Sequence, residues 1–129
     1  MIRLRENNVL QVMVMLFCMV TVLTLSQGAD AKIFRVNSTK DMVDAAPHDG
    51  VCLTATGVCT LRAAIQEANA LTGTDEIRLK AGTYRLHLIG EGEDFAATGD
   101  LDMTDSVTVV GKGGALTVVD GNVQDNIFP

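Results

Sequence analysis

The sequence predicts a mainly β protein: the first coils of a parallel β-helix, a solenoid of short stacked strands, capped by one amphipathic α-helix. Three observations lead to this prediction. Short alternating or β-branched runs recur over residues 77–120, glycine-rich turns separate them, and convincing signals for two-residue hairpins are scarce. A single helical pattern precedes these runs, where it can cover one end of the stack.

The chain begins with what the sequence predicts to be a secretory signal peptide, residues 1–31. Two arginines open it, residues 9–25 are almost wholly apolar, and an Ala-Asp-Ala triplet ends at Ala31. Cleavage there makes Lys32 the first residue of a mature chain, residues 32–129, which we expect to be secreted or held at the cell surface. An uncleaved anchor is the alternative, because the apolar stretch is close to the shortest that spans a bilayer.

The composition excludes some classes of partner. The chain has 10 basic and 16 acidic residues, a formal net charge of −6. Nucleic acids and anionic membrane surfaces require clustered lysine and arginine, so neither is expected as a partner of the mature chain. The chain contains 1 tyrosine and no tryptophan, so few aromatic rings are available for stacking on sugars or bases. Residues 32–129 are enough for one small domain.

Two cysteines remain after the predicted cleavage, Cys52 and Cys59. A pair of cysteines in an exported chain predicts a disulfide, and the intervening Gly57 suits a tight loop. Free thiols are one alternative. A metal site is another, but it needs further ligands, and His48 is the nearest histidine.

The predicted elements follow in order along the chain. A strand over residues 33–37 leads into a loop over 38–50. The helix is predicted from Thr60, a suitable N-cap, to Leu71. Its apolar stripe consists of Leu61, Ala64, Ile65, Ala68 and Leu71, whereas Arg62, Gln66, Glu67 and Asn69 lie away from that stripe. Further strands are predicted over residues 77–79, 84–88, 101–103, 106–110 and 115–120.

The run Cys-Thr-Leu-Arg-Ala-Ala-Ile at residues 59–65 resembles the motif of the CSLREA domain of exported bacterial proteins. Other similar segments are Asp49–Cys52, Ala81–Tyr84, Ala96–Asp102 and Val118–Asn122, so the resemblance covers about residues 34–128. It implies a right-handed, pectate-lyase-like β-helix at the start of a longer protein, and it implies no catalytic residues. Thr60 and Ala63 replace the motif's Ser and Glu, which leaves only half of a capping box.

These observations predict a non-catalytic secreted or cell-surface protein with a structural or adhesive role. Glycans or other cell-surface components are the expected partners, and the open end of the coils offers a surface for self-association. We also expect a truncated product, since the family's coils normally continue further. The alternatives are an inert truncated remnant and a fragment of a pectate-lyase-like polysaccharide-degrading enzyme. Such an enzyme needs a basic residue outside the stack, for which Arg78 and Arg85 are candidates.

Acidic residues gather between residues 91 and 105, and calcium requires six to eight oxygen ligands. Asp94, Asp100 and Asp102 are the candidate ligands, although a solvated acidic loop is the preferred interpretation. No other cofactor is expected, and no residue is assigned a catalytic role.

Overall fold

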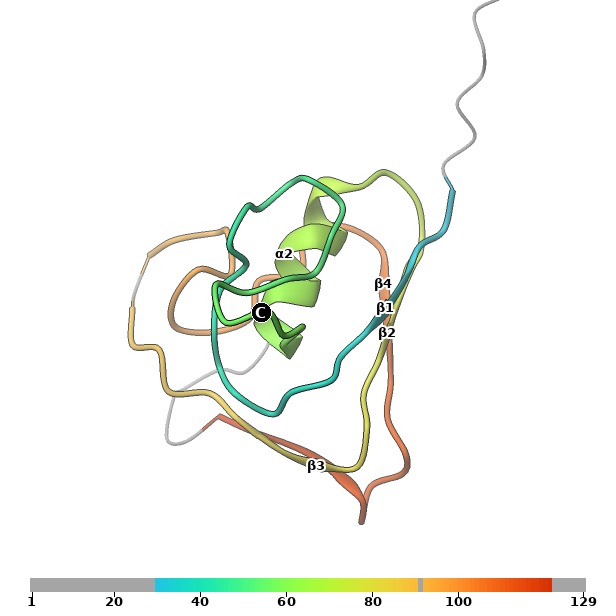
Figure 1. Ribbon diagram of the computed structural model, residues 1–129, viewed down its shortest axis with the longest axis vertical. Coiled ribbons are helices and arrows are strands. Elements are labelled where there is room, and N and C mark those ends of the chain that lie inside the picture. Colours follow the sequence, from blue (N-terminus) through green and yellow to red (C-terminus); the bar gives the residue numbers. More distant parts are fainter. Residues whose placement is uncertain (1–29, 91, 122–129) are drawn as a thin grey trace, which may run out of the picture.

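A computed structural model describes residues 30–90 and 92–121, which form a small assembly of short strands around one helix (Figure 1). The elements are β1 (Ile33–Arg35), α2 (Leu61–Ala70), β2 (Asp75–Arg78), β3 (Gly82–Arg85), β4 (Val107–Val110) and β5 (Thr117–Asp120). More of these residues lie in strands than in the helix. The prediction of a mainly β protein with one α-helix is therefore confirmed for the described part of the chain.

The strands form two sheets in which every pairing is parallel. One sheet has the order β1-β2-β4, and β3 pairs with β5 in the other. The register places Phe34 opposite Ile77 and Ile77 opposite Val109, and it places Tyr84 opposite Val119. Parallel neighbours require long connections, so neighbouring strands of each sheet come from successive passes of the chain around the molecule.

The aligned apolar side chains form the core. Phe34, Ile77 and Tyr84 are buried in one cluster with the helix, whereas Val109 and Val119 are only half-buried against it. β4 and β5 belong to the last pass of the chain among the described residues, so no later strand pairs with them there. Burial therefore decreases toward the last strands.

Two corners join the sheets. Residues 79–81 connect β2 to β3, and residues 111–116 connect β4 to β5. The first corner approaches the loop before the helix so closely that a Cβ atom on Gly82 would lie 2.8 Å from Thr39 Cγ2. The second turns at Gly113, whose φ of +111° favours glycine and whose carbonyl accepts N–H groups from residues 116 and 117 at 2.9 Å each.

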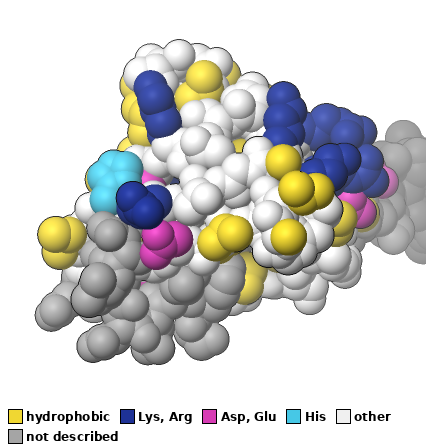
Figure 2. Space-filling view, turned by 90° about the horizontal axis from the view of Figure 1, so that it is seen from below, with side chains coloured by type: hydrophobic (Ala, Val, Ile, Leu, Met, Phe, Trp, Pro, Cys, Tyr) yellow, Lys and Arg dark blue, Asp and Glu magenta, His cyan; other side chains and the backbone are white. Residues whose placement is uncertain are grey.

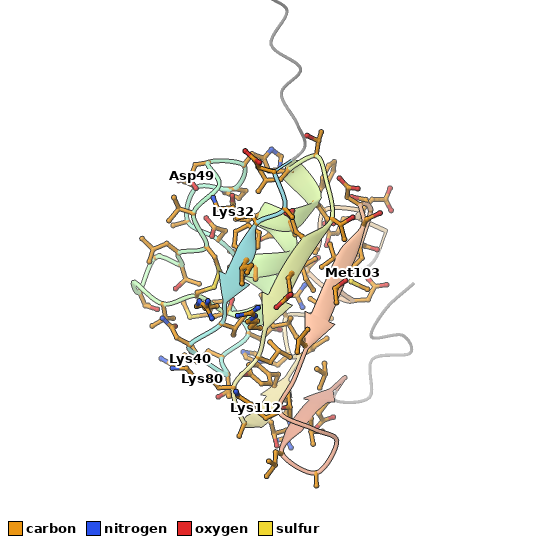
Figure 3. The ribbon with its side chains drawn as sticks, turned by 90° about the vertical axis from the view of Figure 1, so that its right-hand side faces the viewer. Lys32, Lys40, Asp49, Lys80, Met103 and Lys112 are labelled. Carbon is orange, nitrogen blue, oxygen red and sulfur yellow. A yellow bond between two sulfur atoms is a disulfide. The ribbon has the colours of Figure 1, made fainter. Side chains whose placement is uncertain are left out.

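The helix α2 packs against β2 and β4, on the face of the three-stranded sheet that carries the core side chains (Figure 3). Leu61, Ala64, Ile65 and Ala68 are buried there, as the apolar stripe predicts. The helix therefore lies over one face of this sheet. That it caps the end of a solenoid stays a prediction.

The burial of the remaining helical residues also differs from the expectation. Arg62 and Glu67 are 0% exposed and Gln66 is 6% exposed, although all three lie away from the apolar stripe. The loops over residues 36–59 and 92–104 cover these sides of the helix, and their polar contacts are described below. The helix is therefore enclosed between the sheet and two loops.

The short run at residues 101–103 does not form the predicted strand. Leu101 is fully buried, but the segment is irregular, and side-chain atoms of Asn69 bind the backbone of residues 102 and 104. These side-chain bonds replace the pairing that a strand would have provided. The other predicted strands are present, with ends that differ by a few residues.

The predicted disulfide joins Cys52 to Cys59. Inside the closed loop, Gly57 adopts a positive φ of +78°, and backbone bonds of 2.8 Å connect Thr54 with both Gly57 and Val58. Thr60 follows directly as the N-cap of α2. The disulfide therefore closes a small hydrogen-bonded loop immediately before the helix.

Candidate functional site

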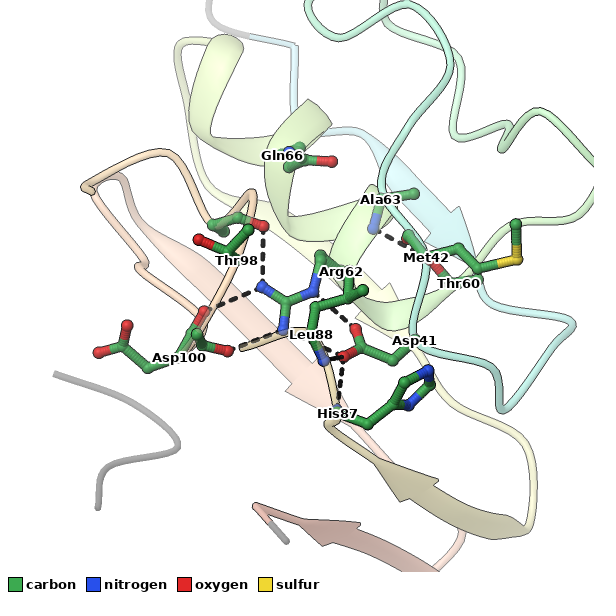
Figure 4. Close-up of polar contacts among 12 residues, drawn as sticks. Asp41, Met42, Thr60, Arg62, Ala63, Gln66, His87, Leu88, Thr98 and Asp100 are labelled. Carbon is green, nitrogen blue, oxygen red and sulfur yellow. Dashed lines mark hydrogen bonds and ion pairs between the residues drawn. The ribbon is translucent and has the colours of Figure 1, made fainter. Parts of the chain in front are cut away.

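The most elaborate polar site surrounds the buried guanidinium of Arg62 (Figure 4). Its Nε donates to Asp41 Oδ1 at 2.6 Å, and Nη2 reaches Asp41 Oδ2 at 3.3 Å. The remaining N–H groups donate to three backbone carbonyls of the 92–104 loop: Ala96 at 3.0 Å, Gly99 at 2.8 Å and Asp100 at 3.1 Å. All five guanidinium N–H groups therefore have acceptors.

Asp41 connects this site to a third segment. Its Oδ2 also accepts the backbone N–H groups of His87 at 2.8 Å and Leu88 at 2.9 Å. Burial raises the pKa of Asp41, but the hydrogen bonds from Arg62 and from the amides of Leu88 and His87, with the positive charge of Arg62, outweigh burial and lower it below 3.8. The carboxylate is therefore ionised at neutral pH.

Arg62 and Asp41 together hold the helix, the loop before it and the segment after β3. Both side chains are essentially inaccessible to solvent. A general acid or base must reach a substrate, and these groups have all their bonding capacity committed to the protein backbone and to each other. We interpret the pair as a structural clamp.

Other polar side chains of α2 bind loops in the same way. Glu67 accepts the N–H groups of His48 at 2.7 Å and Gly50 at 2.5 Å, and Gln66 accepts that of Asp44 at 2.8 Å. Asn69 donates to the Asp102 carbonyl at 2.6 Å and accepts the Thr104 N–H at 3.0 Å. The helix thus orders two loops that contribute few apolar side chains of their own.

A carboxylate group that the sequence analysis missed lies beside this arrangement. Carboxylate oxygens of Asp44, Asp49 and Glu67 all lie within 4.8 Å of one another. Burial, together with the negative charges of Asp44 and Asp49, raises the pKa of Glu67 despite the bonds from the His48 and Gly50 amides. Asp44 likewise accepts amides, of Ala46 at 2.9 Å and Leu53 at 2.8 Å. These hydrogen bonds indicate that the carboxylates of Asp44 and Glu67 order the loop before α2.

The three calcium candidates lie in the loop before β4. Asp94 is exposed, while Asp100 and Asp102 are partly buried. Burial raises the pKa of Asp102, the negative charge of Asp100 adds to the increase, and a backbone bond from Ala96 opposes it. Asp100 uses its backbone carbonyl to accept from Arg62, so its position serves the clamp. Calcium binding by these three residues stays a prediction.

Basic side chains gather at the carboxyl ends of β1, β2 and β4, where the register places Arg35 beside Arg78 and Arg78 beside Val110. They line an open groove of about 580 Å³. Its ionisable lining residues are Arg35, Glu76, Arg78, Lys80 and Lys112. Figure 2 shows Lys and Arg side chains gathered beside hydrophobic ones, and Figure 3 shows Lys80 and Lys112 close to the same end of the molecule.

The charge balance of this basic groove opposes that of the whole chain. Four cations face one carboxylate, that of Glu76, which pairs with Arg78. Because the whole chain carries a net charge of −6, the groove is a local concentration of positive charge on an acidic protein. Such a groove attracts anionic ligands.

Arg85, the other arginine considered as a base, lies outside this groove. It is exposed on β3 and pairs with Asp120 of β5 at 2.9 Å. Arg78 and Arg85 therefore belong to different sheets and do not form one site. The exposed His87 follows Arg85 and contributes its backbone N–H to Asp41.

Among residues 30–90 and 92–121, no helix is long and apolar enough to cross a membrane. Of the predicted leader, only Asp30 and Ala31 are within these residues, next to Lys32, the predicted first residue of the mature chain.

Comparison of the chain with protein-family models, curated proteins and solved structures found no match. The function must therefore be argued from the sites themselves.

Proposed function

We propose that this chain is a non-catalytic secreted or cell-surface module: the N-terminal cap and first coils of a right-handed parallel β-helix. The observation that carries the proposal is the stacking of successive chain passes in two all-parallel sheets, with Phe34, Ile77 and Val109 at one level. Solenoids stack their inward side chains in this way. The resemblance of residues 59–65 to the CSLREA motif supports the same conclusion.

The use of the buried ionisable groups supports a structural role. Asp41, Arg62 and Glu67 all bind backbone groups or one another, and together they order the loops around α2. A site for general acid–base catalysis requires such groups to face a substrate. Because these buried groups bind the protein itself, we place the proposed adhesive activity on the exposed surface.

The basic groove is the surface best suited to adhesion. Arg35, Lys80 and Lys112 present their charges along it, and it is open to solvent. Adjacent strands are about 4.8 Å apart, so the cations on successive coils form a row rather than a point. A row of this kind suits a linear anionic glycan, which presents a carboxylate or sulfate on successive sugar units.

The proposal is tested by binding of the mature chain to immobilised polygalacturonate and to a neutral glucan as control. We expect binding to polygalacturonate alone, weakened by salt because the attraction is electrostatic. The double variant Lys80→Gln/Lys112→Gln should bind at least about tenfold more weakly, a loss that corresponds to about 1.4 kcal/mol. Lys40→Gln/Arg85→Gln removes two cations outside the groove and should bind nearly as well as the wild type. Equal losses in both variants would refute the assignment of the groove.

A polysaccharide lyase fragment is the second candidate, because Arg78 lies in the groove. Incubation with polygalacturonate and Ca²⁺ separates the two functions. The adhesive module should produce no unsaturated sugar, whereas a Ca²⁺-dependent rise in ultraviolet absorbance that Arg78→Lys abolishes would establish the enzyme.

A further inference from the structure

Asp75, the first residue of β2, carries a buried carboxylate that is only half satisfied. The residue is 1% exposed. Its Oδ1 accepts the backbone N–H of Lys32 at 2.8 Å, whereas its Oδ2 is buried and has no hydrogen-bond partner among the described residues. A buried carboxylate requires hydrogen bonds and a counter-charge, and a single peptide N–H supplies only part of this.

We propose that Asp75 is the receptor for a new chain terminus. Hydrolysis of the Ala31–Lys32 peptide bond would leave an α-ammonium on Lys32 that pairs with both oxygens of Asp75. The inference rests on the proposed export of the chain, with removal of its leader by a signal peptidase. In the reaction, water supplies a hydroxyl to the Ala31 carbonyl carbon and a proton to the Lys32 nitrogen. The new carboxylic acid then releases the proton that completes the ammonium.

The geometry requires almost no movement. The Lys32 nitrogen already lies within hydrogen-bond distance of Oδ1. Cleavage changes this nitrogen from one neutral donor into three donors with a positive charge, so it can also reach Oδ2. Hydrogen bonds between ionised partners are roughly twice as strong as those between neutral ones.

The fold retains its other contacts when the chain is cut before Lys32. The Lys32 carbonyl accepts the N–H of Glu76 at 2.8 Å, and its side-chain ammonium binds the Gly50 carbonyl and lies 5.5 Å from the Phe34 ring centroid. Figure 3 shows Lys32 where the chain enters β1. Asp30 and Ala31 are exposed and lie outside the strand. Residues beyond the cut therefore hold the new terminus in place.

The first experiment compares a chain that starts at Lys32 with one that starts at Ala31, both with and without Asp75→Asn. The Lys32 start should have a folding equilibrium constant at least about tenfold larger, as expected for hydrogen bonds to charged groups. Asp75→Asn should abolish this difference. Glu76→Gln, which removes a carboxylate from the outward-facing neighbour, should preserve it. The proposal would be overturned if the chains that begin at Lys32 and at Ala31 were equally stable, or if their difference in stability remained in the Asp75→Asn variants.

A second measurement does not depend on the folding of the Asp75 variant. An ion-paired α-ammonium reacts slowly with acylating reagents, so peptide mapping should show that the terminus at Lys32 is modified at least about tenfold more slowly than the terminus at Ala31. Similar rates would contradict the pairing. N-terminal sequencing of the full chain after export should begin at Lys32, and any other start would overturn the assigned cleavage point. None of these readouts depends on glycan binding, so a failure here is distinguishable from a failure of the adhesive function.

Discussion

Arg62 is difficult to replace, because each of its five N–H groups has an acceptor. Lysine has the same charge but lacks the planar guanidinium group, whose N–H groups donate to acceptors on two sides. We expect Arg62→Lys to lower the free energy of unfolding by about 3 kcal/mol, because buried carbonyls lose their donors. Urea denaturation measures this change.

The matched control is Arg78→Lys. Arg78 also pairs with a carboxylate, but its side chain is 43% exposed, so the change should cost under about 1 kcal/mol. Equal losses at the two positions would mean that the clamp contributes little to stability.

The lowered pKa of Asp41 makes stability depend on pH. Because the folded pKa lies below the unfolded value, the contribution of Asp41 is fully present above the unfolded pKa and is lost as the pH falls through the folded pKa. Between about pH 5 and pH 2, Asp41→Asn should therefore reduce the acid-induced loss of unfolding free energy relative to the wild type. Identical pH profiles for the two proteins would contradict a lowered pKa.

At the scale of elements, the start of α2 depends on one hydroxyl group. Thr60 Oγ1 accepts the Ala63 N–H at 3.2 Å and donates to the Met42 carbonyl at 2.6 Å. Thr60→Ala removes both bonds and should lower the free energy of unfolding by about 1–2 kcal/mol. Thr60→Ser keeps the hydroxyl and should recover most of the loss, as thermal and urea denaturation would show. If serine and alanine were equally destabilising, the lost methyl packing of threonine would be the cause.

Local patterns made the elements predictable, but not the loops around them. The 3.6-residue period of Leu61, Ala64 and Ile65 predicts the buried face of α2, and Gly113 predicts a corner. The loops are ordered by bonds between residues 17 to 47 positions apart, such as those of Glu67 and Asp41. Hydrophobic periodicity contains no information about such bonds, so the polar side of the helix was expected to lie apart from the core.

The disulfide could be predicted from the sequence, whereas the basic groove could not. Cys52 and Cys59 lie close in sequence, and their pairing followed from their number. The basic groove combines Arg35, Arg78 and Lys112, which only the register of three parallel strands brings together. The one available signal is that each of these residues lies within a predicted strand or just after one.

For the molecule as a whole, the outer edge of β4 is the surface through which we expect self-association. The carbonyls of Ser106 and Val110 accept bonds from β2, so alternation along the strand directs the N–H and C=O groups of Val109 to the opposite side. We expect concentration-dependent self-association through this edge, measurable by analytical ultracentrifugation. Val109→Pro removes an edge-facing donor and should shift the equilibrium toward monomer while the fold persists.

The control is Thr108→Pro, whose N–H faces β2 by the same alternation and whose substitution should destabilise the fold. Unchanged association of a folded Val109→Pro protein would exclude the β4 edge as the contact.

The bonds that Asp41 makes to His87 and Leu88 span 46 and 47 residues, and they have a kinetic consequence. Contacts between distant parts of a chain form late and slow down folding. Arg62 cannot complete its set of acceptors until the chain has been synthesised as far as residue 100. A nascent chain that ends before this point therefore lacks part of the clamp formed by Arg62 and Asp41. We therefore expect the polypeptide to fold slowly after synthesis, a property that would suit the export that we propose for this chain.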